Sequence, residues 1–389
     1  MMSSTAEVRV LYVLPNFGVG GAEQSLYLIA RHVDRSEAAV YMAALGPPRR
    51  PVEETVLPRL EELGIDVVDL AVTGRADRSL RALLVAAVRL RALCRDLRID
   101  VVDTALFEAD LVARVALLGT RRRHVVHLVN TPYDAQVGRH ALFRGPWRLR
   151  AARILDATTA RLTDRFVAIS DAVAGAARRD LRLPDRVITA VPRGVDLAEF
   201  PALAPPAPSR DGALRLLAIG RLVPQKGHET LIRAVGVARQ AGTAVRLTIA
   251  GEGPLRDELG ALAVELGVAD AVDLLAPRQR VVELHRDHDA FCFPSRWEGQ
   301  GNALLEAMAC ARPVVASDIP VLREVAGPDA TFVPVDDPDA WSDAIVALSE
   351  MRPEARAEVG AALRVRVAER YDASATVAAL VDVYRDLVR

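Results

Sequence analysis

The 389-residue sequence is poor in several features that would mark particular classes of protein. Its only cysteines are Cys94, Cys292 and Cys310, an odd number without metal-ligand spacing, which argues against a disulfide framework and for a reducing compartment. The longest apolar run, residues 10–22, contains Pro15 and three glycines, so we expect no membrane-spanning helix. The first residues lack the basic and apolar regions of a secretory signal. We therefore expect a cytoplasmic protein.

An excess of one charge is also missing. The 50 basic and 51 acidic residues give a formal net charge of −1, which argues against a nucleic-acid-binding protein with a basic surface. Lysine is almost absent, because Lys226 is the only lysine among the 50 basic residues. Lysine is a compact point charge and arginine a planar fork, so we interpret Lys226 as part of a site where arginine does not serve. The alternative is that one lysine escaped a general bias toward arginine.

What the sequence does contain is enough apolar material for two packed domains, with 51% hydrophobic and 26% charged residues. Residues 8–14 form an almost wholly apolar strand pattern, followed by a glycine-rich loop and helical spacing over residues 22–33. Further strands are predicted at 39–43, 66–70, 101–104, 125–129 and 166–169, with helical patterns between them such as 79–98. This alternation predicts a parallel, doubly wound sheet.

The alternation stops at residues 200–212, a proline-rich stretch that we interpret as an interdomain linker. It then restarts, with strands predicted at 214–220, 245–250, 272–275, 290–294, 313–316 and 331–335 and helices at 228–240, 254–266, 302–310, 339–349, 354–371 and 373–388. The fold class is therefore α/β, with two Rossmann-like halves. Ligands of such sheets bind beyond the carboxyl ends of the strands, so the loops that follow strands are the candidate sites.

Two of these loops contain residues suited to a sugar nucleotide. Arg221 and Lys226 lie five residues apart between a strand end and a helix start. The planar guanidinium of Arg221, the compact ammonium of Lys226 and the free N–H groups at the start of the helix together suit a diphosphate. In the second loop, Glu298 precedes a helix that we expect Asn302 to cap, and Glu306 lies about one turn into that helix. Carboxylates beside backbone donors suit sugar hydroxyls. The alternatives are two solvated cations in the first loop and ordinary surface glutamates in the second.

Several short motifs occur in a fixed order along the chain. They are Gly20-Gly21-Ala-Glu23, Ala168-Ile-Ser-Asp171, Val191-Pro-Arg-Gly-Val-Asp196, Gly-Arg221-x4-Lys226-Gly, Gly251-Glu-Gly-Pro254, Glu298-x7-Glu306 and the run from Ala307 to Asp318. Together they resemble the motifs of family 4 glycosyltransferases over nearly the whole chain. The resemblance implies a GT-B architecture, with two Rossmann-like domains facing a deep cleft. An N-terminal acceptor domain would span residues 1–199, completed by a helix at about 373–389, and a donor domain would span residues 200–372.

The resemblance also implies the reaction. It is a retaining, metal-independent transfer of a sugar from a nucleotide diphosphate sugar, UDP-sugar first and GDP-sugar next, to an acceptor hydroxyl. The acceptor would be a small molecule, a glycan or a lipid-linked intermediate, and no cofactor or metal is expected. Two alternatives remain open at this point: a nucleotide-sugar epimerase or hydrolase of the same fold, and a non-catalytic partner protein that binds nucleotide sugars.

Site residues follow from the resemblance position by position. Arg221 and Lys226 would hold the diphosphate and stabilise the leaving charge, Glu298 would contact the donor sugar, and Glu306 would hold the ribose. The remaining donor contacts would be Gly20, Gly21, Gly251, Gly253, Gly299, Gln300, Gly301 and Asn302, with the base near residues 251–254 and 276–280. Because the family assigns Glu298 to binding, we favour attack from the face of the leaving group over a covalent intermediate.

The chain departs from the family at Asn130, where many members have a histidine. Asn130 cannot act as a base but can hydrogen-bond a sugar hydroxyl, so it stays a catalytic candidate. His127 lies nearby, but we expect strand alternation to point it elsewhere.

Residues 121–165 contain ten arginines against three aspartates. Within this region Phe143, Trp147 and Arg148 are candidates for contact with an anionic acceptor or with the inner membrane surface. The alternative is a solvated helix face in an arginine-rich protein.

Overall fold

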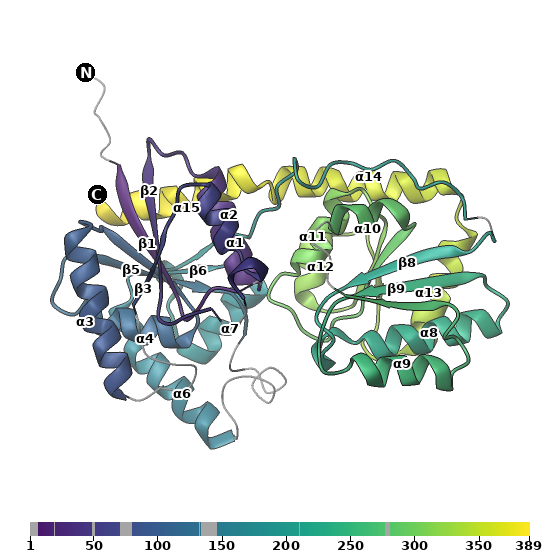
Figure 1. Ribbon diagram of the computed structural model, residues 1–389, viewed down its shortest axis with the longest axis horizontal. Coiled ribbons are helices and arrows are strands. Elements are labelled where there is room, and N and C mark those ends of the chain that lie inside the picture. The colour runs from purple at the N-terminus through teal and green to yellow at the C-terminus, as the bar shows by residue number, and fades with distance from the viewer. Residues whose placement is uncertain are drawn as a thin grey trace. The chain divides into compact units, whose positions relative to one another are not determined.

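The computed structural model describes residues 7–18, 20–48, 51–70, 80–131, 133, 146–209, 211–276 and 281–389. The chain forms two compact units (Figure 1). Unit 1 comprises Met1–Gly194 and Ala373–Arg389, and unit 2 comprises Val195–Asp372. The chain thus passes from unit 1 to unit 2 five residues before the boundary expected from the sequence, and it returns to unit 1 at Ala373.

Within the described residues, the sheet of unit 1 has seven parallel strands in the order β3-β2-β1-β4-β5-β6-β7. They are β1 (Val8–Leu14), β2 (Ala38–Ala44), β3 (Val67–Asp69), β4 (Val101–Ala105), β5 (Arg123–Leu128), β6 (Arg165–Ala168) and β7 (Ile188–Ala190). The strand order reverses between β1 and β4, which is the point where open sheets of this kind bind ligands.

Helices cover both faces of this sheet, which is why its central strands are apolar on both sides. Tyr12 and Leu14 of β1 face α1 (Gly21–His32) and α15 (Ala373–Val388), whereas Leu11 and Val13 face α3 (Leu80–Asp96) and α4 (Phe107–Ala116). The other helices and 3-10 turns are η1 (Val52–Glu54), α2 (Leu57–Glu62), α6 (Pro146–Thr159), η2 (Ala160–Leu162), α7 (Asp171–Leu181) and η3 (Asp185–Val187).

In the described part of unit 2, a sheet of six parallel strands has the order β10-β9-β8-β11-β12-β13. They are β8 (Leu214–Ile219), β9 (Val245–Ala250), β10 (Val272–Leu275), β11 (Ala290–Phe293), β12 (Val314–Ser317) and β13 (Thr331–Val333). The helices are α8 (His228–Gln240), α9 (Arg256–Glu265), α10 (Val281–Asp287), α11 (Asn302–Ala309), α12 (Pro320–Ala326), α13 (Pro338–Glu350) and α14 (Pro353–Arg370). Helices α8, α9 and α13 pack on one face of the sheet.

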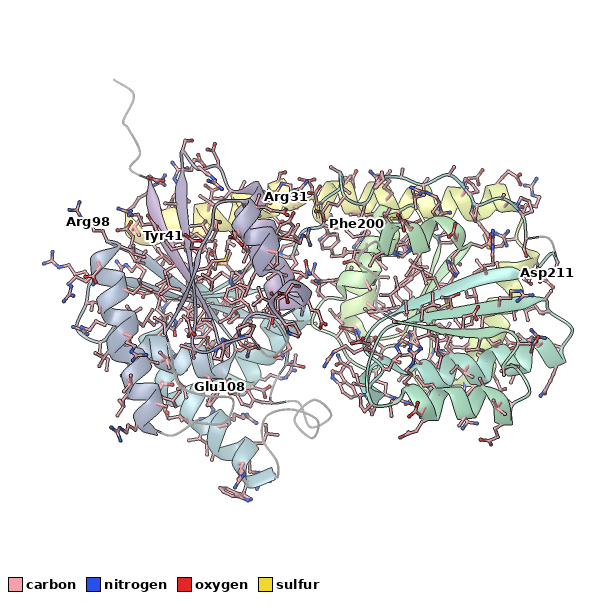
Figure 2. The ribbon with its side chains drawn as sticks, viewed as in Figure 1. Arg31, Tyr41, Arg98, Glu108, Phe200 and Asp211 are labelled. Carbon is pink, nitrogen blue, oxygen red and sulfur yellow. The ribbon has the colours of Figure 1, made fainter. Side chains whose placement is uncertain are left out.

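The proline-rich stretch is not the interdomain linker that the sequence suggested. It follows the boundary and forms part of unit 2, where Figure 2 shows Phe200 and Asp211 at opposite ends of the unit. Side chains of unit 2 bind its carbonyl groups: Arg364 donates to Phe200 O at 2.8 Å and Arg312 to Ala204 O at 2.7 Å. A proline-rich segment cannot form regular backbone hydrogen bonds, but here arginine side chains donate to its carbonyl groups.

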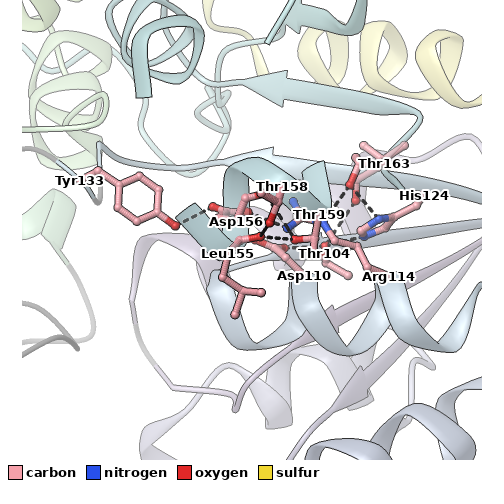
Figure 3. Close-up of polar contacts among 11 residues, drawn as sticks. Thr104, Asp110, Arg114, His124, Tyr133, Leu155, Asp156, Thr158, Thr159 and Thr163 are labelled. Atoms are coloured by element: carbon pink, nitrogen blue, oxygen red, sulfur yellow. Dashed lines mark hydrogen bonds and ion pairs between the residues drawn. The ribbon is translucent and has the colours of Figure 1, made fainter. Parts of the chain in front are cut away.

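A buried polar network ties α6 to the rest of unit 1 (Figure 3). Arg114 of α4 donates through Nη1 to Asp156 Oδ1 of α6 at 2.6 Å and through Nε to Thr163 Oγ1 at 3.1 Å. The side chains of Arg114 and Asp156 are 2% and 9% exposed, so the ion pair is shielded from water. Tyr133 donates to the other carboxylate oxygen of Asp156 at 2.6 Å. These bonds hold α6 against α4 independently of apolar packing.

The same network continues to the strands. Thr104 Oγ1 of β4 lies 2.6 Å from Asp110 Oδ1 and 3.0 Å from His124 Nε2. Burial raises the pKa of Asp110 to about 8. Burial, together with the charge of Arg114, lowers the pKa of His124 to about 3. Both side chains are therefore mainly uncharged at neutral pH, which leaves Arg114 and Asp156 as the charged pair of the network.

Candidate functional site

The loops that follow β8 and β11 come together at one edge of the unit 2 sheet. The two strands are parallel neighbours, so their carboxyl ends lie side by side. The first loop contains Arg221 and the 3-10 turn η4 (Pro224–Lys226), and the second contains Glu298 and leads into α11. The structure thus joins the two loops in which the sequence predicted a diphosphate site and a sugar site.

Gln225 fastens the two loops to each other. Its carbonyl oxygen accepts a hydrogen bond from the backbone N–H of Arg296 at 2.8 Å, and its Nε2 donates to Trp297 O at 2.8 Å. Its Oε1 accepts from Arg221 Nη2 at 3.2 Å. Arg221 is otherwise exposed at the surface of the loop. These bonds make η4 and the loop after β11 one connected structure.

Arg296 strengthens this connection, although the sequence did not single it out. Its Nη2 donates to Glu229 of α8 at 2.6 Å, its Nε lies 2.9 Å from both carboxylate oxygens of Asp336, and its Nη1 donates to the carbonyl of Pro224. The guanidinium fork therefore joins three segments around the loop that carries Glu298. Arginine is so common in this chain that composition offered no signal for it.

Lys226 and Glu298 contact each other at the centre of these loops. Lys226 Nζ donates to Glu298 Oε1 and lies 5.0 Å from the centre of the Phe293 ring. The two side chains are only 14% and 9% exposed. The stem of Lys226 packs on Gly220, where a Cβ would lie 3.3 Å from Lys226 Cδ. An ammonium group has three N–H donors, so its contact with Glu298 leaves two for a ligand.

Two glycines of this site have backbone conformations that other residues rarely adopt. Gly227 has φ +62°, and a Cβ there would overlap the carbonyl oxygen of Pro294. Gly301 has φ +94° and is the N-cap of α11. The prediction that Asn302 caps this helix is wrong, because Asn302 is its first helical residue and no side chain caps it. The free N–H groups of the first turn are thus not occupied by a capping side chain.

Gly251 and Gly253 have a packing role. A Cβ on Gly251 would overlap the carbonyl oxygen of Gly220, and a Cβ on Gly253 would overlap that of Leu222. The two backbones are joined where Leu222 N–H donates to Glu252 O at 2.8 Å. The glycines therefore let the loop after β9 lie directly against the loop that carries Arg221. Of the predicted base-contact region at 276–280, residues 277–280 lie outside the described part of the chain.

Burial changes the protonation of two groups near this site. Burial, together with the nearby carboxylate of Glu199, raises the pKa of Glu306, in the second turn of α11, to about 7. Burial also lowers the pKa of His228 to about 4, helped by the charge of Lys226. At neutral pH His228 is therefore neutral, and Glu306 is close to its midpoint.

In unit 1, the glycine-rich loop before α1 is occupied by a side chain of the same helix. The backbone N–H groups of Gly18 and Gly20 donate to the carboxylate of Glu23, and a Cβ on Gly20 would lie 2.6 Å from Glu23 Oε2. Burial raises the pKa of Glu23, and the charge of Arg193 opposes that shift. Gly20 is the N-cap of α1 and Gly21 its first residue, so the predicted donor contacts lie at the positive end of the helix.

Asn130 and Trp147 lie at the surface of unit 1. Asn130 is exposed, two residues beyond the end of β5. Trp147 of α6 is 66% exposed, with the guanidinium carbon of Arg148 5.2 Å from its ring centre. Phe143 lies outside the described residues. No helix in the described ranges has both the length and the apolar character needed to cross a bilayer.

The structure also brings together two residues that sequence reasoning missed. His127 of β5 and Asp103 of β4 point to the same face of the sheet, and His127 Nδ1 lies 2.8 Å from Asp103 Oδ1. We expected strand alternation to point His127 elsewhere than Asn130, and His127 lines a cavity of unit 1 whose wall does not include Asn130. The signal was present in Val101-Val-Asp103 and Val125-Val-His127, two strands in which a polar residue follows two valines.

Known proteins resemble this chain in sequence and in fold. The profile described as "Glycosyltransferase Family 4" matches residues 19–199, and that described as "Glycosyl transferases group 1" matches residues 213–351. Among solved structures, a glycosyltransferase of Rickettsia africae is 14% identical, with a TM-score of 0.79, covering 98% of this chain and 99% of that one. The Anabaena protein HepE, in complex with UDP and glucose, is 19% identical with a TM-score of 0.78, covering 98% and 100%. These likenesses confirm the predicted α/β fold with two Rossmann-like domains.

Two curated relatives are named D-inositol 3-phosphate glycosyltransferases. The protein of Saccharomonospora viridis is 34% identical over 68% of this chain and 66% of its own length. That of Thermobispora bispora is 32% identical over 78% of this chain and 74% of its own length. The match to the first relative therefore spans slightly less than two thirds of it. Both family profiles are matched in order, and the resemblance first seen in the motifs is confirmed: the chain belongs to the family 4, or group 1, glycosyltransferases.

Proposed function

We propose that this protein is a retaining glycosyltransferase that moves a sugar from a nucleotide diphosphate sugar to an acceptor hydroxyl. The contact between Lys226 and Glu298 carries this proposal. It joins an ammonium and a carboxylate, both mostly buried, in two loops of which one carries Arg221 and the other leads into the N-terminal turn of α11. Cations and free backbone N–H groups suit a diphosphate, and a carboxylate suits the hydroxyls of the attached sugar.

The donor phosphates would bind between the loops after β8 and β11. Lys226 has two N–H donors left after its contact with Glu298, and the exposed guanidinium of Arg221 adds further N–H donors. As the bond to the sugar breaks, negative charge grows on the diphosphate, and these fixed cations stabilise it. They supply the charge that a divalent metal would otherwise provide, so we propose transfer without a metal.

We favour a UDP-sugar as the donor, with a GDP-sugar next. HepE, which shares the fold, was solved with UDP and with UDP-glucose. Glu306 is the group we assign to the ribose hydroxyls, and the loops after β9 and β10 are assigned to the base. The acceptor would be a small molecule, a glycan or a lipid-linked intermediate. The relatives named for D-inositol 3-phosphate make a cyclic polyol one acceptor to test.

The pairing of Glu298 favours front-face attack over a covalent intermediate. A carboxylate that neutralises an adjacent ammonium is a weaker nucleophile than a free one. In the proposed step the acceptor oxygen bonds to the anomeric carbon on the face that the phosphate leaves. The bond from that carbon to the phosphate oxygen breaks with its electron pair on the phosphate. The acceptor's proton passes to the departing phosphate oxygen.

We assign the reaction to the cytoplasm, in keeping with three free, buried cysteines. Trp147 and Arg148 on α6 would contact an anionic acceptor or the inner membrane surface, because an exposed indole beside arginines suits that boundary.

Thermal stabilisation by a panel of UDP-, GDP- and ADP-sugars tests the donor site. A ligand that binds only the folded state raises the unfolding midpoint, and we expect one nucleotide to do so selectively. Lys226→Ala should abolish the shift, whereas Arg239→Ala, which alters an exposed pair on α8, should keep it. An equal shift in wild type and Lys226→Ala would contradict the assigned phosphate site.

Product analysis then separates transfer from the alternatives. Retention at the anomeric carbon, read by NMR, with unchanged rates in EDTA, is the expected result. Free sugar or an epimerised donor without any transferred product would instead favour a hydrolase or epimerase. Donor binding without turnover, in the presence of an acceptor panel, would favour a non-catalytic binder.

A further inference from the structure

Unit 1 contains a cavity between its sheet and helices α1 and α15. It has a volume of about 60 Å³, and every residue that lines it belongs to unit 1. Most of its wall is apolar, including Leu26, Ile29, Val129, Val377 and Leu380. On this measure one water needs about 10–15 Å³, so the cavity has room for several waters or a small hydrocarbon group. Its floor is formed by strand residues near the switch point between β1 and β4.

A chain of hydrogen bonds ends at this cavity. Tyr384 of α15 donates to Asp103 Oδ2, and Tyr12 lies 2.9 Å away from it, oxygen to oxygen. Because the single proton of Tyr384 is used on Asp103, Tyr12 must donate to Tyr384. Burial raises the pKa of both tyrosines well above the ordinary value, so both keep their protons. The direction of the chain is thereby fixed from Tyr12 to Tyr384 to Asp103.

Asp103 in turn sets the state of His127. Its Oδ1 accepts a hydrogen bond from His127 Nδ1 at 2.8 Å, which places the ring proton on Nδ1. In the neutral ring the lone pair is then on Nε2, which has no hydrogen-bond partner among the residues that the structure describes. His127 lines the cavity, and its side chain is 14% exposed. A carboxylate–imidazole pair of this kind presents an acceptor atom for a hydroxyl.

The other polar side chains in the wall interact within the protein. The charge of Arg193 acts on the carboxylate of Glu23. Ser25 donates to Gly21 O at 2.9 Å and Thr376 donates to Ala373 O at 3.1 Å. The cavity therefore offers a hydrogen-bond acceptor at His127 Nε2 in a largely apolar wall. Further hydroxyls of a polyol would be buried against apolar side chains, and each unpaired one would lower affinity about 5- to 150-fold. An apolar alcohol would leave none.

We propose that this cavity receives an apolar part of the sugar acceptor, whose hydroxyl donates to His127 Nε2. The proposal rests on the glycosyltransferase function and names the acceptor as an alcohol with a hydrocarbon portion rather than a free polyol. Asp103 and Tyr384 are positioning residues, because they act only through His127. Asn130, exposed beyond the same strand, is not part of the cavity wall.

Propan-1-ol and ethane-1,2-diol are matched probes, because each has about as many non-hydrogen atoms as the cavity has room for waters, and the second has a hydroxyl where the first has a methyl group. Saturation-transfer NMR on the full chain should detect propan-1-ol and give a much weaker signal for ethane-1,2-diol. Ala22→Leu, which adds a side chain at the cavity wall, should remove the propan-1-ol signal. His127→Phe should weaken its affinity about fivefold, as expected for one hydrogen bond. His32→Phe, on α1 but outside the wall, should have no effect.

A second measurement tests the positioning role of Asp103 and keeps the proposal falsifiable if a cavity variant fails to fold. In Asp103→Asn the amide oxygen can accept from Tyr384 while the amide nitrogen donates to His127 Nδ1. The ring proton should then move to Nε2, which 15N chemical shifts of His127 report. Propan-1-ol binding should weaken about fivefold, since Nε2 no longer accepts. An unchanged tautomer would overturn the assigned chain.

The outcomes separate this inference from the proposed function. Equal signals for the two probes, or a propan-1-ol signal that is unchanged in both Ala22→Leu and His127→Phe, would overturn the cavity proposal even if UDP-glucose stabilises the same sample. Propan-1-ol binding that follows the expected pattern supports the alcohol site. In that case, a complete lack of stabilisation by all three classes of nucleotide sugar would count against the donor assignment alone.

Discussion

The ammonium of Lys226 lies between a carboxylate and an aromatic ring, and its stem packs directly on Gly220. A guanidinium has the same charge but a wider, planar head. We predict that Lys226→Arg lowers donor kcat/KM at least about tenfold while the unfolding midpoint changes little. Arg239→Lys, at an exposed position of α8, is the matched control and should leave both unchanged. Full activity in Lys226→Arg would mean that only charge matters at this position.

Glu306 predicts a pH dependence of donor binding. Its pKa of about 7 means that the ionised carboxylate, which accepts hydrogen bonds at both oxygens, grows in population from pH 6 to pH 8. If Glu306 binds the ribose, donor affinity should rise about tenfold over that interval. Calorimetric titration at several pH values measures this. Glu306→Gln should flatten the profile, and a profile that keeps its slope would show that another group is responsible.

The raised pKa of Glu306 has the opposite effect on folding stability in the absence of donor: stability falls as pH rises, whereas donor affinity rises. The folded state keeps a proton that the unfolded chain releases above the ordinary glutamate pKa of about 4.3. The contribution of Glu306 to folding stability is therefore present at low pH and falls as pH rises toward its folded pKa of about 7. Donor binding and intrinsic stability thus respond to pH in opposite directions at this one residue.

At the scale of elements, Gly251 and Gly253 decide how two loops pack. A methyl group at either position would overlap a carbonyl oxygen of the neighbouring loop. We predict that Gly251→Ala and Gly253→Ala each lower the free energy of unfolding by about 2 kcal/mol or more, measured in urea. Gly236→Ala, inside α8 where a Cβ meets only ordinary contacts at 3.8 Å, should instead raise it by about 0.5–1 kcal/mol. Equal effects at all three positions would contradict the assigned packing role.

The position of α6 depends on one buried ion pair. Asp156→Asn would leave the charge of Arg114 without its buried partner, so we expect a loss of about 3–5 kcal/mol in unfolding free energy. Asp180→Asn removes a comparable pair at the surface, 3.8 Å from Arg153, and should cost less than about 1 kcal/mol. Denaturant unfolding of both variants makes the comparison. Similar losses would mean that the network around Arg114 relaxes or admits water.

Element positions were accessible from the sequence wherever burial left a strong periodic pattern. Each strand and helix predicted by residue range is present, with ends within two residues of the prediction. The missed strand β7 is three residues long and half exposed, so no apolar run marks it. The proline-rich stretch at 200–212 was misread because its ordering comes from Arg312 and Arg364, which are more than 100 residues distant in sequence.

In the candidate site, too, the sequence indicated the residues with a local pattern and not those that tertiary structure brings together. The pattern of Arg221, Lys226, Glu298 and Glu306 identified the loops of unit 2, because charge and spacing are local. Asp103 and His127 belong to different strands, and only the register that pairs Ala105 with His127 brings them to one face. Tyr384, which completes that chain, comes from the far end of the sequence. The sequence marks Asp103 and His127 each as a polar residue after two valines, but which strands are neighbours, and in which register, depends on tertiary structure.

At the scale of the molecule, unit 1 is built from two separate stretches of chain. Helix α15 packs against α1 and β1, and Tyr384 binds Asp103 in the middle of the sheet. We predict that a chain ending at Asp372 loses the cooperative unfolding of unit 1 but keeps that of unit 2, whose residues are all present. Differential scanning calorimetry of the full and shortened chains checks this. Two unchanged transitions in the shortened chain would mean that α15 adds little to unit 1.

This discontinuity bears on how the protein is made. Chains are synthesised from the N-terminus, and domains usually fold in that order. Here most of unit 1 leaves the ribosome first, yet its sheet stays uncovered on the α15 side until unit 2 has been translated. Unit 2 is a contiguous stretch of chain and can fold before unit 1, which is incomplete until α15 has been synthesised. The later-made unit would therefore finish first, and in the meantime the apolar face beneath α15 is a natural target for chaperones.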